Sequence, residues 1–492
     1  MTALREKDAP WGRVYVLHCA HSHTDFRIPE IVASAEYLGL RHELLPTPSR
    51  ECPDGLLGDV SRPFMLCRLE DDEAARQMLR RCSCLRGIWE LWACADTYVD
   101  LHARNQARRA YEPWLAPQYT WKALMQGFNV AMGSKRRIAL IESFSYMDFK
   151  GPTQMRGSDV TWGVLEEYRR PTDPQDVEAR GHAELGDRDP RLVQLFLGRK
   201  IKDRTGAMPA RDLIDALDLK KRTYIGNTSM ESEMSVIMAT MALAGPGQFI
   251  YDPFAGTGSM LYACSMLGAF TFGSDIDGRM LRGKDRQGPS GITRSAQQYG
   301  LRGRVVDTAV FDMTQSPWRV PFRGEVGLFD AIVTDPPYGV RAGAKRQGRR
   351  NIEHQRDEPF IMADGRAAHT LPDYIPPTKP YHLSELIADL LAYASALLRP
   401  GGRLVFWLPT MTEDDVETTI PEHKHFVLVA HSLQDFGRWG RRLITMQKKD
   451  DAAQSTMPSS YDRMAVPRRM LANEKPDEFR NRLFTPPPAT SS

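Results

Sequence analysis

The fold is decided by the stretch Phe329-Asp330-Ala331-Ile332-Val333-Thr334, which runs directly into Asp335-Pro336-Pro337-Tyr338. The first part is a short apolar run typical of a buried strand, and open α/β sheets bind ligands at the carboxyl ends of such strands. The two prolines fix φ near −65° and stiffen the turn. The Asp335 carboxylate and the Pro336 carbonyl can each accept a hydrogen bond from an amino group, and the Tyr338 ring can stack on a flat base. The turn therefore predicts a site that grips an amine, unless it is only the end of a strand.

A second motif lies upstream, where Asp252-Pro253-Phe254-Ala255-Gly256-Thr257-Gly258 follows the apolar run Phe249-Ile250-Tyr251. Gly256 and Gly258 allow the backbone to approach a ligand closely at the start of the next helix. Two glycines alone would fit a dinucleotide equally well. The next strand ends at Asp275, about 20 residues further on, the distance at which a carboxylate meets ribose hydroxyls.

Together these features favour S-adenosylmethionine over a nicotinamide cofactor, because a nicotinamide enzyme needs no amine-binding turn. We expect methyl transfer to an amino group, driven by holding the nitrogen in line with the methyl group. The candidate catalytic residues are Asp335, Pro336, Pro337 and Tyr338. The candidate cofactor residues are Thr228, Asp252, Phe254, Gly256, Gly258, Asp275, Ile276 and Asp312.

The remaining pattern predicts an α/β protein of several domains. Residues 1–95 contain a β-α-β-β-α-β pattern of the ferredoxin-like kind, and residues 96–219 alternate less regularly. Residues 220–448 predict a seven-stranded Rossmann-fold sheet whose last two strands pair antiparallel. Residues 449–492 are polar and rich in Pro and Ser, so we expect a mostly disordered tail with one short helix near Pro476 to Phe484.

Composition narrows the class of protein. The 492 residues are 42% hydrophobic and 26% charged, the balance of an ordinary globular protein. No apolar run is long enough for a membrane span, and the first residues lack a secretory signal. The seven cysteines show no zinc-ligand spacing, so we expect free thiols in a reducing, cytoplasmic compartment and no metal site.

Local charge rather than the net charge of +3 indicates a nucleic-acid partner. The loop after the amine-binding turn sets Arg341, Lys345, Arg346, Arg349, Arg350 and Arg356 against the single acid Glu353. A charge run is often only a solvated face, but one beside a catalytic turn is well placed to hold phosphates. Arg199 and Lys200, expected just after the strand Leu192 to Leu197, form a second candidate phosphate contact.

Three segments resemble one known family, the catalytic subunits of eukaryotic tRNA guanosine-10 N2-methyltransferases. They are Arg222-Thr223-Tyr224-Ile225-Gly226-Asn227-Thr228-Ser229-Met230, the Asp252 to Ser259 motif, and Asp335-Pro336-Pro337-Tyr338-Gly339-Val340-Arg341. The resemblance covers most of residues 13–448. It implies a ferredoxin-like domain, a THUMP RNA-binding domain and a class I methyltransferase domain that acts on the 2-amino group of a guanosine in tRNA.

The resemblance also implies a partner, a small zinc-binding activator protein that forms a heterodimer through the third strand of the methyltransferase sheet. Here that strand is Arg304 to Phe311, with Val305, Val306 and Val310 as the contact residues. An edge strand carrying exposed valines would otherwise favour aggregation. The acidic insertion Pro171 to Pro190 and the basic stretch 341–370 depart from the family pattern.

Three alternatives remain from the residues. A DNA adenine N6-methyltransferase uses the same turn chemistry, but the long region before residue 220 argues against it. A glutamine-modifying protein methyltransferase would more often carry Asn in place of Asp335. A non-catalytic RNA-binding scaffold has no use for intact Asp252, Asp275 and Asp335.

Overall fold

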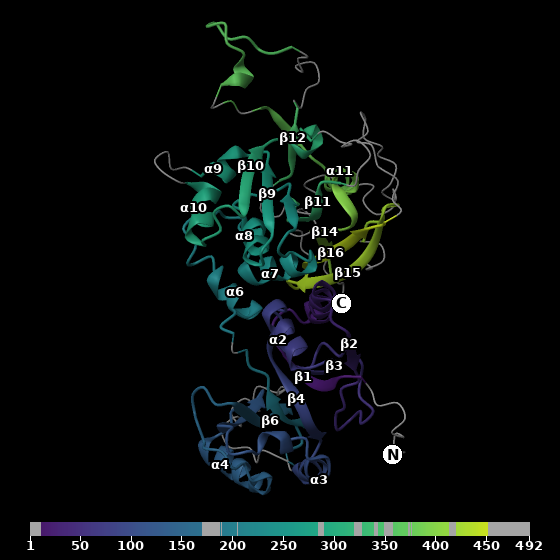
Figure 1. Cartoon of the computed structure of the whole chain (residues 1–492). Coiled ribbons are helices and arrows are strands. Elements are labelled where there is room, and N and C mark those ends of the chain that lie inside the picture. Colours follow the sequence, from purple (N-terminus) through teal and green to yellow (C-terminus); the bar gives the residue numbers. More distant parts are fainter. Residues whose placement is uncertain are drawn as a thin grey trace, which may run out of the picture. The chain divides into compact units, whose positions relative to one another are not determined.

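The computed structural model describes residues 11–169, 187, 189–203, 205–283, 290–318, 327–338, 343–348, 358–371, 374, 376–412 and 420–450. The chain divides into two compact units, an N-terminal unit of residues 1–212 and a C-terminal unit of residues 213–492. Figure 1 colours the first from purple to blue and the second from teal to yellow.

The N-terminal unit is built on one seven-stranded sheet in the order β2-β3-β1-β4-β7-β6-β5. Its strands are β1 (Arg13–Cys19), β2 (His42–Leu45), β3 (Phe64–Leu69), β4 (Leu85–Ala95), β5 (Trp121–Phe128), β6 (Val160–Tyr168) and β7 (Leu192–Lys200). Its helices are α1 (Arg27–Leu38), α2 (Asp72–Arg81), α3 (Tyr98–Arg108) and α4 (Ser134–Ser143). Only β5 and β6 pair in parallel, whereas the other neighbours in this sheet are antiparallel.

The first four strands and two helices have the ferredoxin-like order that the sequence predicts. The acidic start of α2 explains its boundary, because the Asp71 carboxylate accepts hydrogen bonds from the backbone of Glu73 and Ala74, both at 2.9 Å. Strand β4 then pairs with β7, so the sheet continues into the region after residue 95. The boundary proposed at residue 95 therefore separates two parts of one sheet.

The C-terminal unit contains a second seven-stranded sheet in the order β10-β9-β8-β11-β14-β16-β15. Its strands are β8 (Phe249–Asp252), β9 (Phe270–Asp275), β10 (Val305–Val310), β11 (Phe329–Thr334), β14 (Leu398–Met411), β15 (Phe426–Asp435) and β16 (Trp439–Lys448). The helices are α6 (Ala210–Ala216), α7 (Ser232–Met241), α8 (Ser259–Met266), α9 (Gly278–Arg282), α10 (Gly291–Gln298) and α11 (Leu383–Leu397). A two-stranded ribbon joins β12 (Lys345–Gln347) to β13 (Thr378–Pro380).

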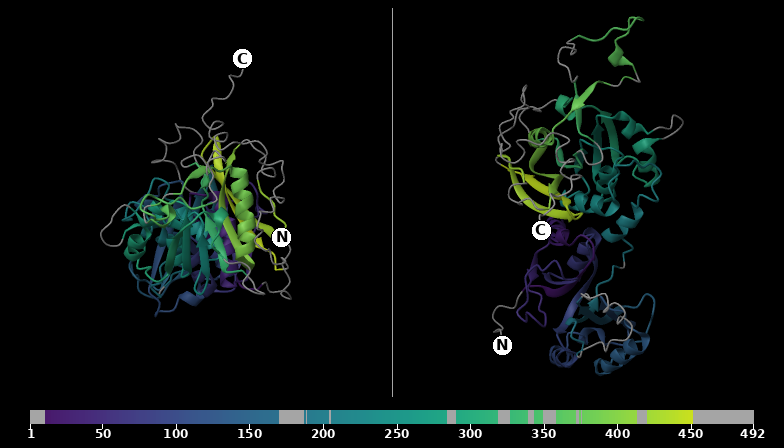
Figure 2. Two further views of the ribbon diagram at one scale, coloured as in Figure 1. Left: turned by 90° about the horizontal axis from the view of Figure 1, so that it is seen from above. Right: turned by 180° about the vertical axis from the view of Figure 1, so that it is seen from behind.

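Five adjacent strands of this sheet, β10 to β14 in the spatial order, run parallel, and β16 is antiparallel to both β14 and β15. This confirms the predicted seven-stranded sheet with an antiparallel final pair. The carboxyl ends of β8, β9, β10 and β11 therefore meet along one edge, which can be followed in Figures 1 and 2.

Alternation along the strands explains the core. Tyr251, Ile332 and Phe406 belong to a buried cluster with Leu386 and Leu390 of α11. Because side chains alternate along a strand, the residues before and after each of these three face the opposite side of the sheet. The strands thus carry apolar residues on both faces, as the near-continuous hydrophobic runs in the sequence indicate.

Two predictions concern residues that lie wholly or largely outside the described part of the chain. The tail, with its helix near Pro476 to Phe484, lies there except for its first two residues, and so does most of the acidic insertion Pro171 to Pro190. Among the described helices, none combines the length and the apolar character needed to cross a membrane.

Candidate active site

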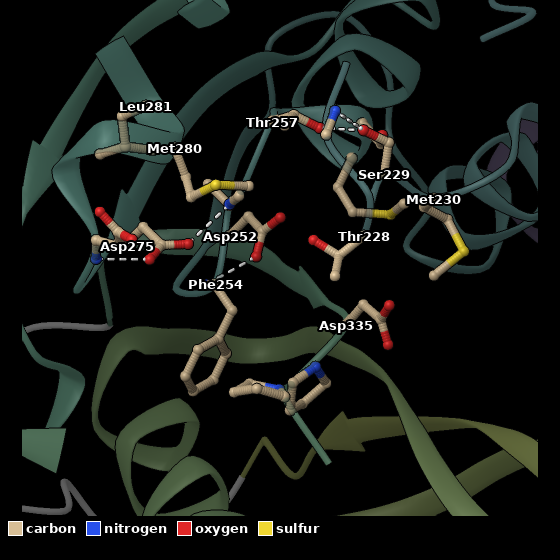
Figure 3. A pocket seen from close by; sticks show the side chains of 18 of the residues that line it. Thr228, Ser229, Met230, Asp252, Phe254, Thr257, Asp275, Met280, Leu281 and Asp335 are labelled. Carbon is tan, nitrogen blue, oxygen red and sulfur yellow. Dashed lines mark hydrogen bonds between the residues drawn. The ribbon is translucent and has the colours of Figure 1, made fainter. Parts of the chain in front are cut away.

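A cleft of about 1910 Å³ opens at the carboxyl edge of the C-terminal sheet. It brings together most residues of the two sequence motifs, namely Thr228, Asp252, Phe254, Gly256, Asp275, Ile276, Asp312, Asp335, Pro336, Pro337 and Tyr338. Gly258 is the one candidate cofactor residue that does not line it. Figure 3 shows Asp252, Asp275 and Asp335 around this space.

The amine-binding turn begins directly after β11, whose residues Ala331 to Thr334 are buried between β8 and β14. Thr334, the last strand residue, donates its hydroxyl hydrogen to Asp252 Oδ1 at 2.6 Å. The Asp335 side chain is 26% exposed and lines the cleft, although its Oδ1 atom is buried. A rigid strand thus delivers a reachable carboxylate, which is what the sequence predicts for this turn.

Asp252 is almost completely buried at the end of β8. Its Oδ1 accepts hydrogen bonds from Thr334 and, at 3.0 Å, from the Phe254 backbone. Burial nevertheless raises the pKa of Asp252 to about 7, and the charges of Asp275 and Asp335 add to that rise. Asp252 therefore links two strand ends and titrates near neutral pH.

Asp275 closes β9 and receives two backbone hydrogen bonds. Gly256 N–H donates to Oδ2 at 2.9 Å and Asp277 N–H donates to Oδ1 at 2.8 Å. Burial raises the pKa of Asp275, whereas these two bonds oppose the shift. The carboxylate is thereby fixed beside the glycine turn, where each oxygen retains a second lone pair for a ligand.

The glycine turn itself requires glycine. Gly256 and Gly258 have φ of 51° and 86°, in the left-handed region that favours this residue. Gly258 directly precedes helix α8, and a Cβ atom at this position would lie 2.9 Å from the Tyr262 ring. Gly258 therefore shapes the turn from behind, although it does not line the cleft.

Asp312 follows β10 and is buried. Its Oδ1 accepts a hydrogen bond from Thr314 N–H at 2.8 Å, and its Oδ2 accepts one from the Gln347 backbone. The carboxylate thus connects the end of β10 to strand β12. Ile276 and Phe254, the other predicted cofactor contacts, line the same cleft.

The loop of residues 220–230 forms another wall of the cleft. Ser229 Oγ lies 2.7 Å from Thr257 Oγ1 and accepts a hydrogen bond from Gly226 N–H at 2.9 Å. Arg222 is buried, donates to Ser259 Oγ at 2.8 Å and also bonds the Thr257 carbonyl. These contacts hold the loop against the glycine turn, and Thr228 of this loop lines the cleft between Asp252 and Asp335 (Figure 3).

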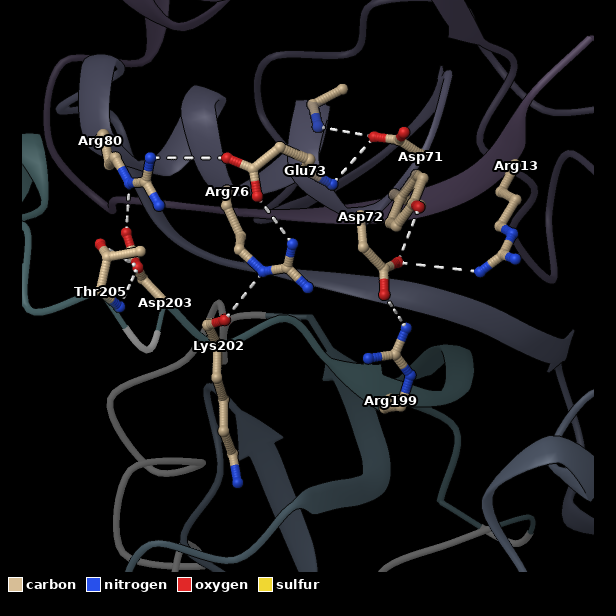
Figure 4. A network of polar contacts seen from close by, with 12 residues as sticks. Arg13, Asp71, Asp72, Glu73, Arg76, Arg80, Arg199, Lys202, Asp203 and Thr205 are labelled. Carbon is tan, nitrogen blue, oxygen red and sulfur yellow. Dashed lines mark hydrogen bonds and ion pairs between the residues drawn. The ribbon is translucent and has the colours of Figure 1, made fainter.

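The strand boundary expected before Arg199 was wrong, because β7 continues through Gly198 to Lys200. Arg199 is buried, and its guanidinium donates to Asp72 Oδ2 at 2.5 Å (Figure 4). The same guanidinium donates to Glu90 Oε2 at 2.9 Å. It also lies over the Trp114 ring, 4.1 Å from the centroid. Arg199 therefore joins elements within the N-terminal unit. Lys200 is partly buried, and burial lowers its pKa.

The predicted RNA contacts near the catalytic turn have different positions. Lys345 lines the cleft and is exposed. Arg346 pairs with Glu385 at 3.0 Å and its guanidinium lies 5.1 Å from the Tyr381 ring centroid. The other basic residues of that stretch, Arg341, Arg349, Arg350 and Arg356, lie outside the described residues.

The sequence reasoning missed one wall of the cleft, which the hairpin β15–β16 supplies. Gln434, Phe436, Trp439 and Arg441 line it, and Arg441 Nη1 lies 4.0 Å from Asp335 Oδ2. The sequence predicted only that the last two strands pair antiparallel, and the strand order that explains this wall comes from the structure. In the observed sheet, β16 lies two strands away from β11 and runs in the opposite direction, so that its first residues lie near the end of β11.

In the described part of the chain, no group of three or more His, Cys, Asp or Glu side chains could hold a metal ion. All seven cysteines are free, and five of them are buried. The described side chains that line the cleft therefore supply carboxylates, hydroxyl groups, aromatic rings and the cationic groups of Arg279, Arg282, Lys345 and Arg441.

A seven-stranded sheet with a glycine turn after its first strand, acids at its strand ends, an Asp-Pro-Pro-Tyr turn after its fourth strand and an antiparallel final pair defines a class I methyltransferase. Two family profiles agree with this fold. The Tmrp11 THUMP N-terminal domain matches residues 13–188, and the RMKL-like methyltransferase domain matches residues 220–355.

Known relatives extend the match over most of the chain. The tRNA (guanine(10)-N(2))-methyltransferase of Schizosaccharomyces pombe is 34% identical over 501 residues, which cover 96% of each protein. The Saccharomyces cerevisiae enzyme of the same name is 33% identical over 87% of this chain and 92% of its own. Human tRNA (guanine(10)-N(2))-methyltransferase TRMT11 is 31% identical over 88% of each. The chain belongs to this family, which confirms the resemblance seen in the sequence.

Proposed function

We propose that this chain is the catalytic subunit of a tRNA methyltransferase. It transfers a methyl group from S-adenosylmethionine to the exocyclic N2 of the guanosine at position 10. One observation carries the proposal: the amine-binding turn Asp335–Tyr338 and the cofactor motifs around Asp252 and Asp275 line the same cleft. Membership of the family supports the choice of guanosine over adenine.

The residues of the cleft fit the cofactor by their chemistry. Asp275 offers a fixed carboxylate to two ribose hydroxyls, and Asp312 offers an acceptor to the amino group of an adenine ring. Phe254 and Ile276 supply apolar surface, and Thr228 lines the same cleft. When bound, S-adenosylmethionine supplies an electrophilic methyl group on a sulfonium.

The work of the chain is to hold the target amine. The Asp335 carboxylate and the Pro336 carbonyl each accept a hydrogen bond from one of its two N–H groups. These bonds favour the pyramidal and more nucleophilic form of the nitrogen. The guanine leaves the base stack and lies against Tyr338. Most of the acceleration comes from orientation, because positioning two reactants can supply about 7–11 kcal/mol of the barrier. Asp335 or solvent takes the released proton.

Two partners follow from this proposal. The N-terminal unit grips the tRNA, and Lys345, together with Arg341, contacts phosphates next to the target base. The zinc-binding activator pairs with β10, which lies at one edge of the sheet formed by the described strands. On this strand, Val306 and Val310 are 54% and 48% exposed, and Val305 is partly buried. The zinc belongs to the activator. The cytoplasmic location inferred from the sequence stays a prediction.

The experiment is an assay of methylated products. The full chain and its activator are incubated with radiolabelled S-adenosylmethionine and unmodified tRNA, and the RNA is digested to nucleosides. Label in N2-methylguanosine supports the proposal, and replacing guanosine 10 by adenosine should remove it. Label in N6-methyladenine of a DNA substrate would instead establish the adenine enzyme. Cofactor binding without any labelled product would leave an RNA-binding scaffold.

A further inference from the structure

Arg441 lies beside the catalytic turn without belonging to either sequence motif. It is the third residue of β16, paired with Pro409 of β14 on one side and Gln434 of β15 on the other. Its side chain lies over the buried Trp407 ring, 4.2 Å from the centroid, and its Nη1 lies 4.0 Å from Asp335 Oδ2. The guanidinium therefore lies across β14, the strand that separates β16 from β11.

Neighbouring polar groups fix this guanidinium in place. Arg441 Nε donates to Gln434 Oε1 at 2.7 Å, and Nη2 lies 3.4 Å from Glu231 Oε1. Gln434 Nε2 in turn donates to the same Glu231 oxygen at 2.8 Å. With Nε and Nη2 held on this side, the planar group directs Nη1 toward Asp335. A guanidinium in such a fixed fork loses little further freedom when it acts on a partner.

The charges around Asp335 explain what this arrangement does. Asp252 on the neighbouring strand β8 loses its proton only near pH 7, and its carboxylate then interacts unfavourably with Asp335. Arg441 supplies the opposite charge from β16, weakened in part by Glu231 before α7. In the proposed reaction, the ionised Asp335 carboxylate accepts a hydrogen bond from the target amine. A cation within about 4–6 Å favours the ionised form of a carboxyl group.

We propose that Arg441 is a positioning residue for methyl transfer, which keeps the Asp335 carboxylate ionised and oriented toward the target amine. This rests on the role proposed above for Asp335. The separation of 4.0 Å between Arg441 Nη1 and Asp335 Oδ2 exceeds a direct hydrogen bond, so Arg441 acts on Asp335 through its charge.

The test is the pH dependence of single-turnover methylation by the full chain with its activator, compared for wild type, Arg441→Met, Arg441→Lys and Arg438→Met. Methionine keeps much of the length and the apolar contact but removes the charge, whereas lysine restores the charge. Arg438 is an exposed arginine of the same hairpin and serves as the matched control.

We expect Arg441→Met to shift the acidic limb of the rate profile upward by about one pH unit, which is about a tenfold loss of rate at the acidic end and little loss at the alkaline end. Arg441→Lys and Arg438→Met should follow the wild-type profile, and the KM values for tRNA and S-adenosylmethionine should stay unchanged.

Glu231→Gln provides a second test, because Glu231 is half exposed and its substitution threatens the fold less than a change at Arg441. Removing its charge strengthens the effect of Arg441 on Asp335, so the acidic limb should move downward. A uniform loss of rate at every pH in Arg441→Met would overturn the proposal. An effect confined to the KM for tRNA would instead make Arg441 a phosphate contact. An inactive wild type would contradict the proposed function, whatever the variants do.

Discussion

Asp335 and Asp275 line the same cleft, but we propose different roles for them. In the proposed reaction, Asp335 accepts a hydrogen bond from the amine in the transition state. Asp275 is instead fixed beside the glycine turn, where the ribose is expected. We expect Asp335→Ala to lower kcat by about 10²–10³-fold while the Kd for S-adenosylmethionine changes little. Asp275→Ala should chiefly weaken cofactor binding. Isothermal titration and single-turnover rates separate the two effects, and an equal loss of both in Asp335→Ala would place that residue in the cofactor pocket.

Asp252 predicts a pH dependence of stability. Burial raises its pKa from 3.8 to about 7, so the folded chain retains a proton that the unfolded chain has lost. The free energy of unfolding contributed by this group is therefore largest at low pH and falls as the pH rises toward about 7, by an amount on the order of 3–4 kcal/mol. Asp252→Asn keeps an oxygen for Thr334 and Phe254 but carries no titrating proton.

The measurement is urea unfolding of both proteins without cofactor between about pH 5 and 8. The wild type should lose stability relative to Asp252→Asn as the pH rises. Asp307→Asn removes an exposed carboxylate from the same unit and is the control, which should follow the wild type. Curves for wild type and Asp252→Asn that stay parallel would mean that Asp252 does not titrate in this range.

Single residues also show where sequence reasoning reached its limit. Apolar runs ending in acids located β8, β9, β10 and β11, because a buried parallel strand has few other patterns. Arg199 was placed outside its strand because a charge usually marks solvent, and the acids that neutralise it, Asp72 and Glu90, come from distant parts of the sequence. Arg441 was missed for the same reason, since only the folded sheet brings β16 next to the catalytic turn.

At the scale of the element, the two edges of the C-terminal sheet make a controlled comparison. Among the described strands, β10 and β15 form the two edges of this sheet. Both carry exposed valines, because Val306 is 54% exposed and Val427 is 45% exposed. Only β10 is the proposed binding strand for the activator. We expect Val306→Lys to weaken activator binding by at least about tenfold, because a lysine ammonium must be desolvated in an apolar contact.

Val427→Lys adds the same charge to the opposite edge and should leave the heterodimer intact. The measurement is the Kd of the purified pair, with the melting temperature of each variant alone as a check on folding. Equal weakening by both substitutions would indicate a general effect of charge. If neither weakens binding, the activator pairs elsewhere on the chain.

At the scale of the whole molecule, the division into two units predicts how the chain unfolds. Every residue that lines the cleft, from Leu219 to Arg441, belongs to the C-terminal unit, whereas the N-terminal unit has its own sheet and core. A ligand stabilises only the part that binds it, by about 2.7 kcal/mol at a concentration 100-fold above Kd. We therefore expect calorimetry to resolve two transitions, of which S-adenosylhomocysteine raises only one.

Hydrogen exchange assigns that transition, because cofactor-induced protection should stay within residues 213–450. The variant Asp275→Ala is the control and should abolish the shift at the same cofactor concentration without moving the other transition. A single transition that moves as a whole would show that the two units unfold cooperatively. Cofactor binding in the cleft would then alter the stability of the N-terminal unit, the part that we propose binds the tRNA.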